Sequence, residues 1–185
     1  MGRIQRVRQE ADAIREQARF EPITILVWGP GDPGPSAPEK KRKAYEKRLK
    51  IKEVLRATFR RASVHFSEDR EMLKIAEGIH GTLRKEALQA KLADLILMLD
   101  VSRGVDLELD HFVPTYPWFR DKVYVFLPKQ FVESPGLVAE VLKYLRSDQV
   151  EGFSKEEFRR CDVARVKAVR AAMTWALDSY LRRTK

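Results

Sequence analysis

The stretch that most constrains the fold is residues 93–112, where an uninterrupted apolar run ends at an acidic residue and gives way, past one glycine, to an acidic helical pattern. A strand in a parallel sheet covered on both faces contains consecutive apolar residues instead of alternating apolar and polar ones, and Leu95–Leu99 has this pattern. Such sheets bind ligands at the carboxyl ends of their strands. The acids expected at that end are Asp100, Asp106, Glu108 and Asp110.

These acids also have an ordinary structural explanation. Asp106 can cap the following helix, expected over about 106–112, because its carboxylate can accept hydrogen bonds from free backbone N–H groups. Asp106 and Asp110 then share one helix face, whereas Glu108 points about 200° away from Asp106. The sequence leaves both interpretations open: a solvated acidic face, or a Glu108 carboxylate that faces the end of the sheet and can attack or stabilise an anomeric carbon.

Strands alternate with helical patterns along the chain, without hairpin signals, and this predicts an α/β domain with a parallel sheet of four or five strands and helices on both faces. Strands are expected at 23–28, 63–66, 94–100 and 122–127, with a short one near 149–153. Helices are expected at 39–61, 70–93 with a break near His80–Gly81, 136–145, and after the capping box Ser154–Glu157. Two prolines are expected to keep residues 113–120 out of regular structure.

The chain of 185 residues suits one domain, predicted at 21–185, preceded by an amphipathic helix over residues 1–20. Apolar residues recur in that helix at spacings of three and four: Ile4, Val7, Ala11, Ile14 and Ala18. This stripe can pack on its own domain or on a second copy of the chain, so a homodimer through the N-terminal helix is one expectation.

The net charge of +9 raises the question of polyanionic partners. Lys and Arg concentrate in residues 40–61 and at the C-terminal end, in segments with helical patterns. We interpret these as helices with a solvated basic face and favour this over a nucleic-acid interface, because no nucleic-acid-binding motif is present. In the helix over 39–61, the residues expected to face the sheet are Tyr45, Leu49, Val54, Leu55 and Phe59.

The cysteine count and the lengths of the apolar runs indicate the compartment in which the protein is expected. The single Cys161 excludes an intrachain disulfide and a cysteine-based metal site, which suits a reducing compartment. No apolar run approaches the ~20 residues of a membrane span, and the N-terminus has no signal-peptide pattern. We expect a soluble cytoplasmic protein with no membrane partner.

Two patterns in the sequence resemble known binding sites but lack features that such sites need. Gly29, Gly31 and Gly34 match the spacing of the dinucleotide fingerprint, but the interspersed prolines lack N–H groups and no helix can begin before Pro38, so the loop cannot cradle a pyrophosphate. The loop can still form the wall of a ligand pocket. The three histidines are scattered along the chain, and the sequence therefore predicts no metal site.

Residues 93–109 resemble the central strand and following helix of the nucleoside 2-deoxyribosyltransferases and of the related TIR-like nucleotide hydrolases. In these families a strand preceded by Ala/Asn-Asp leads through a loop to a helix with a catalytic glutamate. The resemblance implies a flavodoxin-like (TIR-like) fold and matches the catalytic glutamate to Glu108. An upstream acid matches Glu86, and a loop acid loosely matches Asp100.

The resemblance implies cleavage or transfer at the N-glycosidic bond of a nucleoside or nucleotide, without a metal or other cofactor and with NAD as one candidate substrate. Substrate contacts are then expected from Trp28, Gly29, Pro30, Gly31, Ser102 and Trp118. The alternative is a non-catalytic module of the same fold that binds a nucleotide or a protein.

Overall fold

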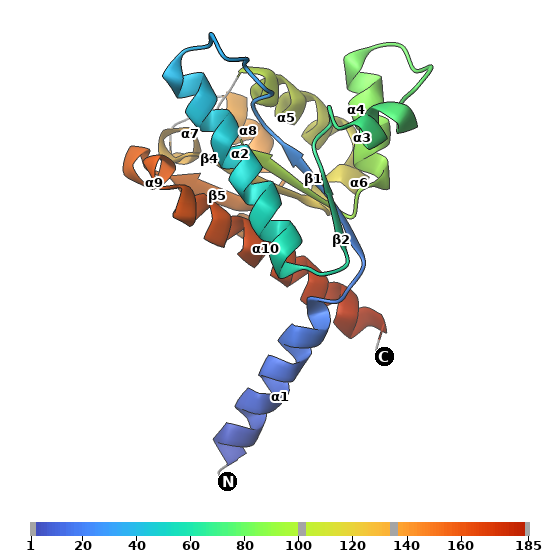
Figure 1. Cartoon of the computed structure of the whole chain (residues 1–185), viewed down its shortest axis with the longest axis vertical. Coiled ribbons are helices and arrows are strands. Elements are labelled where there is room, and N and C mark those ends of the chain that lie inside the picture. Colours follow the sequence, from blue (N-terminus) through green and yellow to red (C-terminus); the bar gives the residue numbers. More distant parts are fainter. Residues whose placement is uncertain (1–2, 100–102, 134–136, 184–185) are drawn as a thin grey trace.

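The structure, a computed structural model, describes residues 3–99, 103–133 and 137–183. Five strands form one all-parallel sheet in the order β2-β1-β3-β4-β5 (Figure 1). The strands are β1 (Ile23–Trp28), β2 (Ala62–His65), β3 (Leu95–Leu99), β4 (Val123–Pro128) and β5 (Val150–Phe153). The predicted flavodoxin-like α/β architecture is confirmed, and the short strand near residue 150 is its fifth strand.

The strand order places a topological switch point between β1 and β3. The chain leaves β1 to form β2 on one side and then returns to pair β3 on the other, so that Ile25 is paired with both Val64 and Leu95. The connections that leave β1 and β3 therefore diverge to opposite sides at the carboxyl end of the sheet, and a crevice for ligands typically forms between them.

Burial explains why β3 is central. All five of its residues are buried, and their side chains alternate between two apolar clusters, one on each face. One face is covered by α2 (Glu39–Thr58) and α10 (Cys161–Arg183). The other is covered by α3 (Arg70–Ile75), α4 (Thr82–Leu92), α5 (Arg103–Thr115), α6 (Pro117–Arg120) and α8 (Leu137–Leu142).

Three short elements complete the described part of the chain: α7 (Lys129–Glu133), the 3-10 turn η1 (Ser147–Gln149) and α9 (Lys155–Arg159). The predicted capping box is present, because Ser154 accepts a hydrogen bond from the Glu157 N–H and the Glu157 carboxylate accepts one from the Ser154 N–H. The break predicted near His80–Gly81 is confirmed between α3 and α4, where Gly78 and Gly81 have φ angles of 77° and 89°.

The helix after β3 differs from its prediction at both ends. It begins at Arg103 instead of Asp106, so Asp106 lies inside α5 and is not its cap. It also continues through Pro114, and Pro117 begins α6. The Arg120 side chain donates to the carbonyls of Val113 and Pro114, which have no following helical N–H partner at this end, and so caps the C-terminus of the helix.

Helix α1 (Arg3–Ala18) projects away from the sheet and its covering helices (Figure 1). Ala18 is fully buried where α1 meets the domain, but Ile4 is 73 % exposed and Val7 57 % exposed. Most of the apolar stripe therefore does not pack on the domain. A second copy of the chain stays the predicted partner of this stripe.

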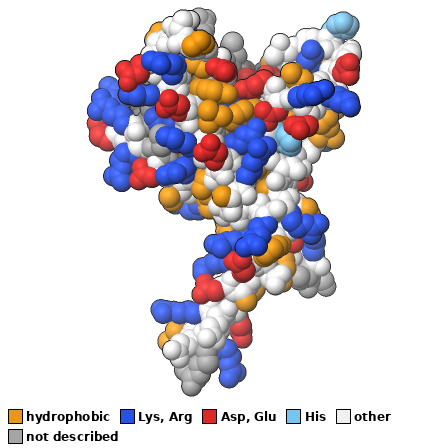
Figure 2. All heavy atoms as spheres, viewed as in Figure 1, with side chains coloured by type: hydrophobic (Ala, Val, Ile, Leu, Met, Phe, Trp, Pro, Cys, Tyr) orange, Lys and Arg blue, Asp and Glu red, His pale blue; other side chains and the backbone are white. Residues whose placement is uncertain are grey.

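Basic and acidic side chains are interspersed over the face of the molecule in view (Figure 2). The excess of Lys and Arg is therefore not gathered into one basic field on this face. Among the described residues, no helix is both long enough and apolar enough to cross a membrane.

Candidate functional site

The first loop closes tightly on the switch point at the carboxyl end of the sheet. A Cβ atom added to Gly29 would lie 3.3 Å from the Leu99 Cβ and 3.4 Å from the Arg48 Cδ. The glycine therefore allows the loop to pack against β3 and α2. Protein atoms fill this space, whereas Gly31 is exposed and its Cβ position meets no atom within 4 Å. Of the loop residues predicted to contact substrate, Gly31 is the open one.

Arg48 of α2 connects the two loops beside the switch point. Its guanidinium is only 1 % exposed. It donates to the Val27 carbonyl from Nε (3.0 Å) and Nη2 (2.8 Å), and to the Pro30 carbonyl from Nη1 (3.2 Å). It also forms a bidentate pair with the Glu68 carboxylate, at 2.5 and 2.9 Å. These contacts, the Arg48 bridge, hold β1, the proline-rich loop and the loop after β2 in one arrangement.

Two basic residues are exceptions to the solvated basic face predicted for this helix. Arg48 and Lys47 are both buried, and three other buried residues share their side of α2: Ala44, Ile51 and Leu55. Tyr45, Leu49 and Val54, expected to face the sheet, are only partly buried. The burial of Arg48 could have been predicted from the spacing of its neighbours. Arg48 lies in an apolar stripe with spacings of four, three and four residues: Ala44, Arg48, Ile51 and Leu55.

Trp28, predicted to stack on a substrate base, is instead a core residue. It is 2 % exposed, and its ring packs on Phe112 and Phe119 at centroid distances of 5.2 and 5.6 Å. Its indole N–H is buried and has no hydrogen-bond partner among the described residues. Stacking on a base would require the ring to leave this aromatic cluster.

The structure does not bring Trp118 together with the first loop. Trp118 lies on α6, immediately before β4, and the parallel arrangement therefore places it towards the amino end of the sheet. Its ring lies beside the ammonium groups of Lys91 (4.8 Å) and Lys122 (5.1 Å). A cleft of about 700 Å³ adjoins it, with walls that include Tyr124, Arg146 and Trp175.

Glu86 of α4 is a desolvated carboxyl group near the carboxyl end of the sheet. It is partly buried, and burial raises the pKa of its carboxyl above the usual value. No hydrogen bond or ion pair joins it to another described residue. One turn further along α4, the Gln89 amide donates to the Ser67 carbonyl (3.0 Å) and the Met72 carbonyl (2.9 Å). This anchors α4 to the loop after β2.

Glu108 lies in the second turn of α5 and is partly buried. Leu109, the next residue, is fully buried in the core cluster that also contains Ala90 of α4. Helices α4 and α5 therefore cover the same face of the sheet, and both begin at its carboxyl end. Asp100 and Ser102, the other predicted contacts from this region, lie outside the described residues.

The end of β2, the turn after it and the start of α3 together carry a group of potential cation ligands that the sequence pattern did not indicate. His65, Asp69 and Glu71 each offer an atom to a common point, and these atoms lie within 4.8 Å of one another. The three histidines are far apart in the sequence, and the relevant pattern is instead one histidine followed by acids four and six residues later, across a strand, a turn and a helix.

The chain matches no protein-family model, and no curated protein matches it. The case for a function therefore depends on the residues and the geometry of the carboxyl end of the sheet.

Proposed function

We propose that this protein cleaves or transfers the N-glycosidic bond of a nucleoside or nucleotide at the carboxyl end of the sheet. Glu108 is the catalytic carboxylate, and Glu86 is the acid that protonates the leaving base. The observation that carries the proposal is the desolvated Glu86 carboxyl, whose pKa is raised by burial and which has no partner among the described residues. A carboxyl with these properties retains its proton to a higher pH and can act as a general acid.

Glu86 and Glu108 come from two separate helices, α4 and α5, and this arrangement suits two different roles. Both come from helices on one face of the sheet, and both helices begin at the carboxyl end of the sheet, where folds of this class bind ligands. Two carboxyl groups with separate environments are the usual requirement for glycosidic chemistry, one to stabilise the anomeric carbon and one to donate a proton. The resemblance of residues 93–109 to the deoxyribosyltransferases supports Glu108 for the first role.

The proposed reaction has two steps. With a purine or pyrimidine nucleoside, a Glu108 oxygen attacks the anomeric carbon, the bond between that carbon and the base nitrogen breaks, and the base takes the bonding electrons and the proton of Glu86. Water or a second base then attacks the same carbon, Glu108 leaves as a carboxylate, and Glu86 regains a proton. Attack by water gives hydrolysis, and attack by a second base gives transfer. Atoms and electrons balance in both reactions without a metal or a redox cofactor.

The test is release of base from NAD and from purine and pyrimidine nucleosides, followed by chromatography. We expect release by the natural chain and none by the Glu108→Gln variant. Glu77→Gln, which changes an exposed carboxylate in the α3–α4 connection, is the matched control and should behave as the natural chain does. Activity of the natural chain no higher than that of Glu108→Gln would refute the proposal.

The role of Glu86 can be tested separately with the leaving group. Nicotinamide leaves NAD as a neutral base without protonation, whereas a purine leaves readily only when protonated. Glu86→Gln should therefore lose about 10²-fold or more with purine nucleosides and much less with NAD. Equal losses with both substrates would show that Glu86 only supports the structure. Saturable nucleotide binding without base release would instead favour a non-catalytic binding module.

A further inference from the structure

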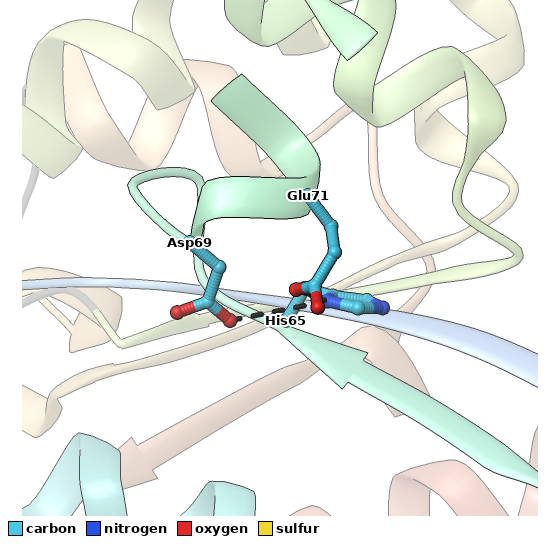
Figure 3. Close-up of side chains that lie close together, drawn as sticks. All are labelled: His65, Asp69 and Glu71. Atoms are coloured by element: carbon cyan, nitrogen blue, oxygen red, sulfur yellow. Dashed lines mark ion pairs between the residues drawn. The ribbon is translucent and has the colours of Figure 1, made fainter. Parts of the chain in front are cut away.

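We propose that His65, Asp69 and Glu71 form a binding site for a divalent metal ion of the zinc class. The site lies on the outermost strand, β2, and does not depend on the proposed glycosidic chemistry. Figure 3 shows the His65 ring and the two carboxylates gathered beneath the first turn of α3.

The local structure explains why these three side chains meet. Val64 and Phe66 are buried in the cluster that faces α2 and α10, so His65, between them on the strand, points to the opposite face, below α3. Asp69 is the residue before the first turn of α3, and Glu71 lies within that turn. The short turn after β2 therefore returns both carboxylates to the histidine ring.

The distances suit a small cation. The His65 Nδ1 lies 3.5 Å from the nearer Glu71 oxygen and 3.9 Å from the nearer Asp69 oxygen. Zinc binds nitrogen and carboxylate oxygen at about 2.0–2.2 Å, so two of its tetrahedral ligands lie about 3.4 Å apart. The His65 Nδ1 already lies within about half an ångström of this spacing from each carboxylate oxygen. All three ligand atoms lie within 4.8 Å of one another, so side-chain rotation has to bring the two carboxylates closer together around an ion.

The ligand chemistry favours a transition metal over calcium or magnesium. The His65 Nδ1 is buried and makes no hydrogen bond with a described residue, so its lone pair is available to a metal when the ring is neutral. One imidazole and two carboxylates are ligands typical of zinc, whereas calcium and magnesium prefer oxygen alone. The Glu71 side chain is 73 % exposed, which gives the ion a path of entry and leaves room for water as a fourth ligand.

Lys52 of α2 is the competitor at this site. Its ammonium group pairs closely with the Asp69 oxygen that faces His65, and the same oxygen accepts a hydrogen bond from the Phe66 N–H at 2.9 Å. A bound cation must share the Asp69 carboxylate with this ammonium. Removing the lysine charge should therefore tighten metal binding. If the three side chains bind no metal ion, removing this charge should produce no metal binding.

The experiment is titration of the metal-free full chain with Co²⁺, monitored by its visible d–d absorption, followed by displacement with Zn²⁺. We expect one equivalent to bind with the intense bands of a four-coordinate site. His65→Ala should weaken binding more than tenfold, because it removes the nitrogen ligand, and Glu71→Gln about tenfold. Lys52→Met should tighten it about tenfold. His80→Ala removes an exposed histidine outside the site and should have no effect.

Three results would overturn the proposal. The first is no stoichiometric binding by the natural chain, including the case in which only Lys52→Met binds, since Lys52 would then occupy the site. The second is binding that His65→Ala leaves unchanged. The third is an equal loss with His80→Ala. Circular dichroism of each variant checks the fold, and Glu71→Gln, an isosteric change on the surface, keeps the test valid if His65→Ala unfolds.

Discussion

The two ends of the sheet each contain a desolvated ionisable group, but only one of these groups has hydrogen-bond partners among the described residues. Lys122, before β4 at the amino end, has a pKa lowered chiefly by burial, and its ammonium donates to the carbonyls of Lys91 (3.1 Å) and Ala93 (2.6 Å). Glu86, towards the carboxyl end, has a pKa raised by burial and no hydrogen bond to another described residue. A buried charge is normally retained only where it is compensated.

This difference in hydrogen-bond partners indicates a structural role for Lys122 and a chemical role for Glu86. The Lys122 ammonium joins the end of α4 to the start of β4, so its charge is used within the fold. Burial of the Glu86 carboxyl costs stability, and no described residue compensates for this cost. A carboxyl of this kind, at the end of the sheet where ligands are expected, is a candidate for catalysis. The Arg48 bridge, also at the carboxyl end, has a structural role there, because it holds the loops after β1 and β2 together.

The largest effect is expected from Arg48→Met. It removes the donors to two backbone carbonyls and leaves Glu68 without its bidentate partner, so the free energy of unfolding should fall by about 4 kcal/mol. Urea unfolding measures this. Lys40→Met, which removes an exposed cation from the same helix, should change stability by less than about 0.5 kcal/mol. Equal effects would show that the Arg48 bridge does not stabilise the carboxyl end.

Two buried glutamines allow the ends to be compared with the same substitution. Gln149 donates to the carbonyls of Arg120 and Val123 and also accepts from the Arg146 N–H, so all of its amide is used at the amino end. Gln149→Leu leaves three backbone groups without partners and should cost about 3 kcal/mol in urea unfolding.

Gln89→Leu is the matched change at the carboxyl end and should cost less, about 2 kcal/mol. Gln89 donates to two carbonyls, but its own buried oxygen has no hydrogen bond with a described residue. The same urea experiment measures it. A larger loss of unfolding free energy for Gln89→Leu than for Gln149→Leu would contradict the prediction that the amino-end glutamine contributes more to stability.

The contributions of Lys122 and Glu86 to the free energy of unfolding should change with pH in opposite directions. The folded pKa of Lys122 lies below the unfolded value, so the unfolded chain binds more protons between the two values and stability rises with pH there. Relative to Lys122→Met, the natural chain should therefore gain stability as pH rises towards 10.5, the ordinary lysine value. Urea unfolding at pH 8 and pH 10 tests this, and a parallel dependence of both proteins would contradict it.

The smallest effect is expected from Glu86→Gln. The folded pKa of Glu86 lies above its ordinary value of 4.5, so the folded chain binds more protons in the window above 4.5 and stability falls as pH rises through it. Glu86→Gln removes this penalty and should be more stable than the natural chain at pH 7, with a smaller difference at pH 4. If the variant were less stable at both pH values, Glu86 would be a structural residue like Lys122.

Much of the fold could be predicted because its signals are local. The continuous apolar residues of β3 identify a buried parallel strand, Pro38 marks where α2 can begin, and Ser154 and Glu157 mark the start of α9. The C-terminal boundary of α5 was predicted less accurately, because Arg120, a residue beyond the helix, caps the carbonyls of its last turn.

The candidate site was predicted less completely because its residues come from separate segments. Arg48 has the appearance of one more charge in a basic helix, and its burial follows only when α2 packs over the ends of β1 and β2. Trp28 and Trp118 are equally plausible stacking residues in the sequence. Packing of α5 and α6 buries the first, and the parallel direction of β4 places the second towards the amino end.

The sequence by itself determined the parallel sheet and the acidic helix that follows its central strand, because hydrophobic periodicity and helix termini depend on neighbouring residues. Only the tertiary structure decided which charges are paired. Arg48, Lys122, Gln89 and Gln149 each bind carbonyls from distant segments, and Glu86 does not bind any described residue. The physical reason is that desolvation and hydrogen bonding depend on which segments meet in space, and these contacts between distant segments distinguish a structural charge from an available one.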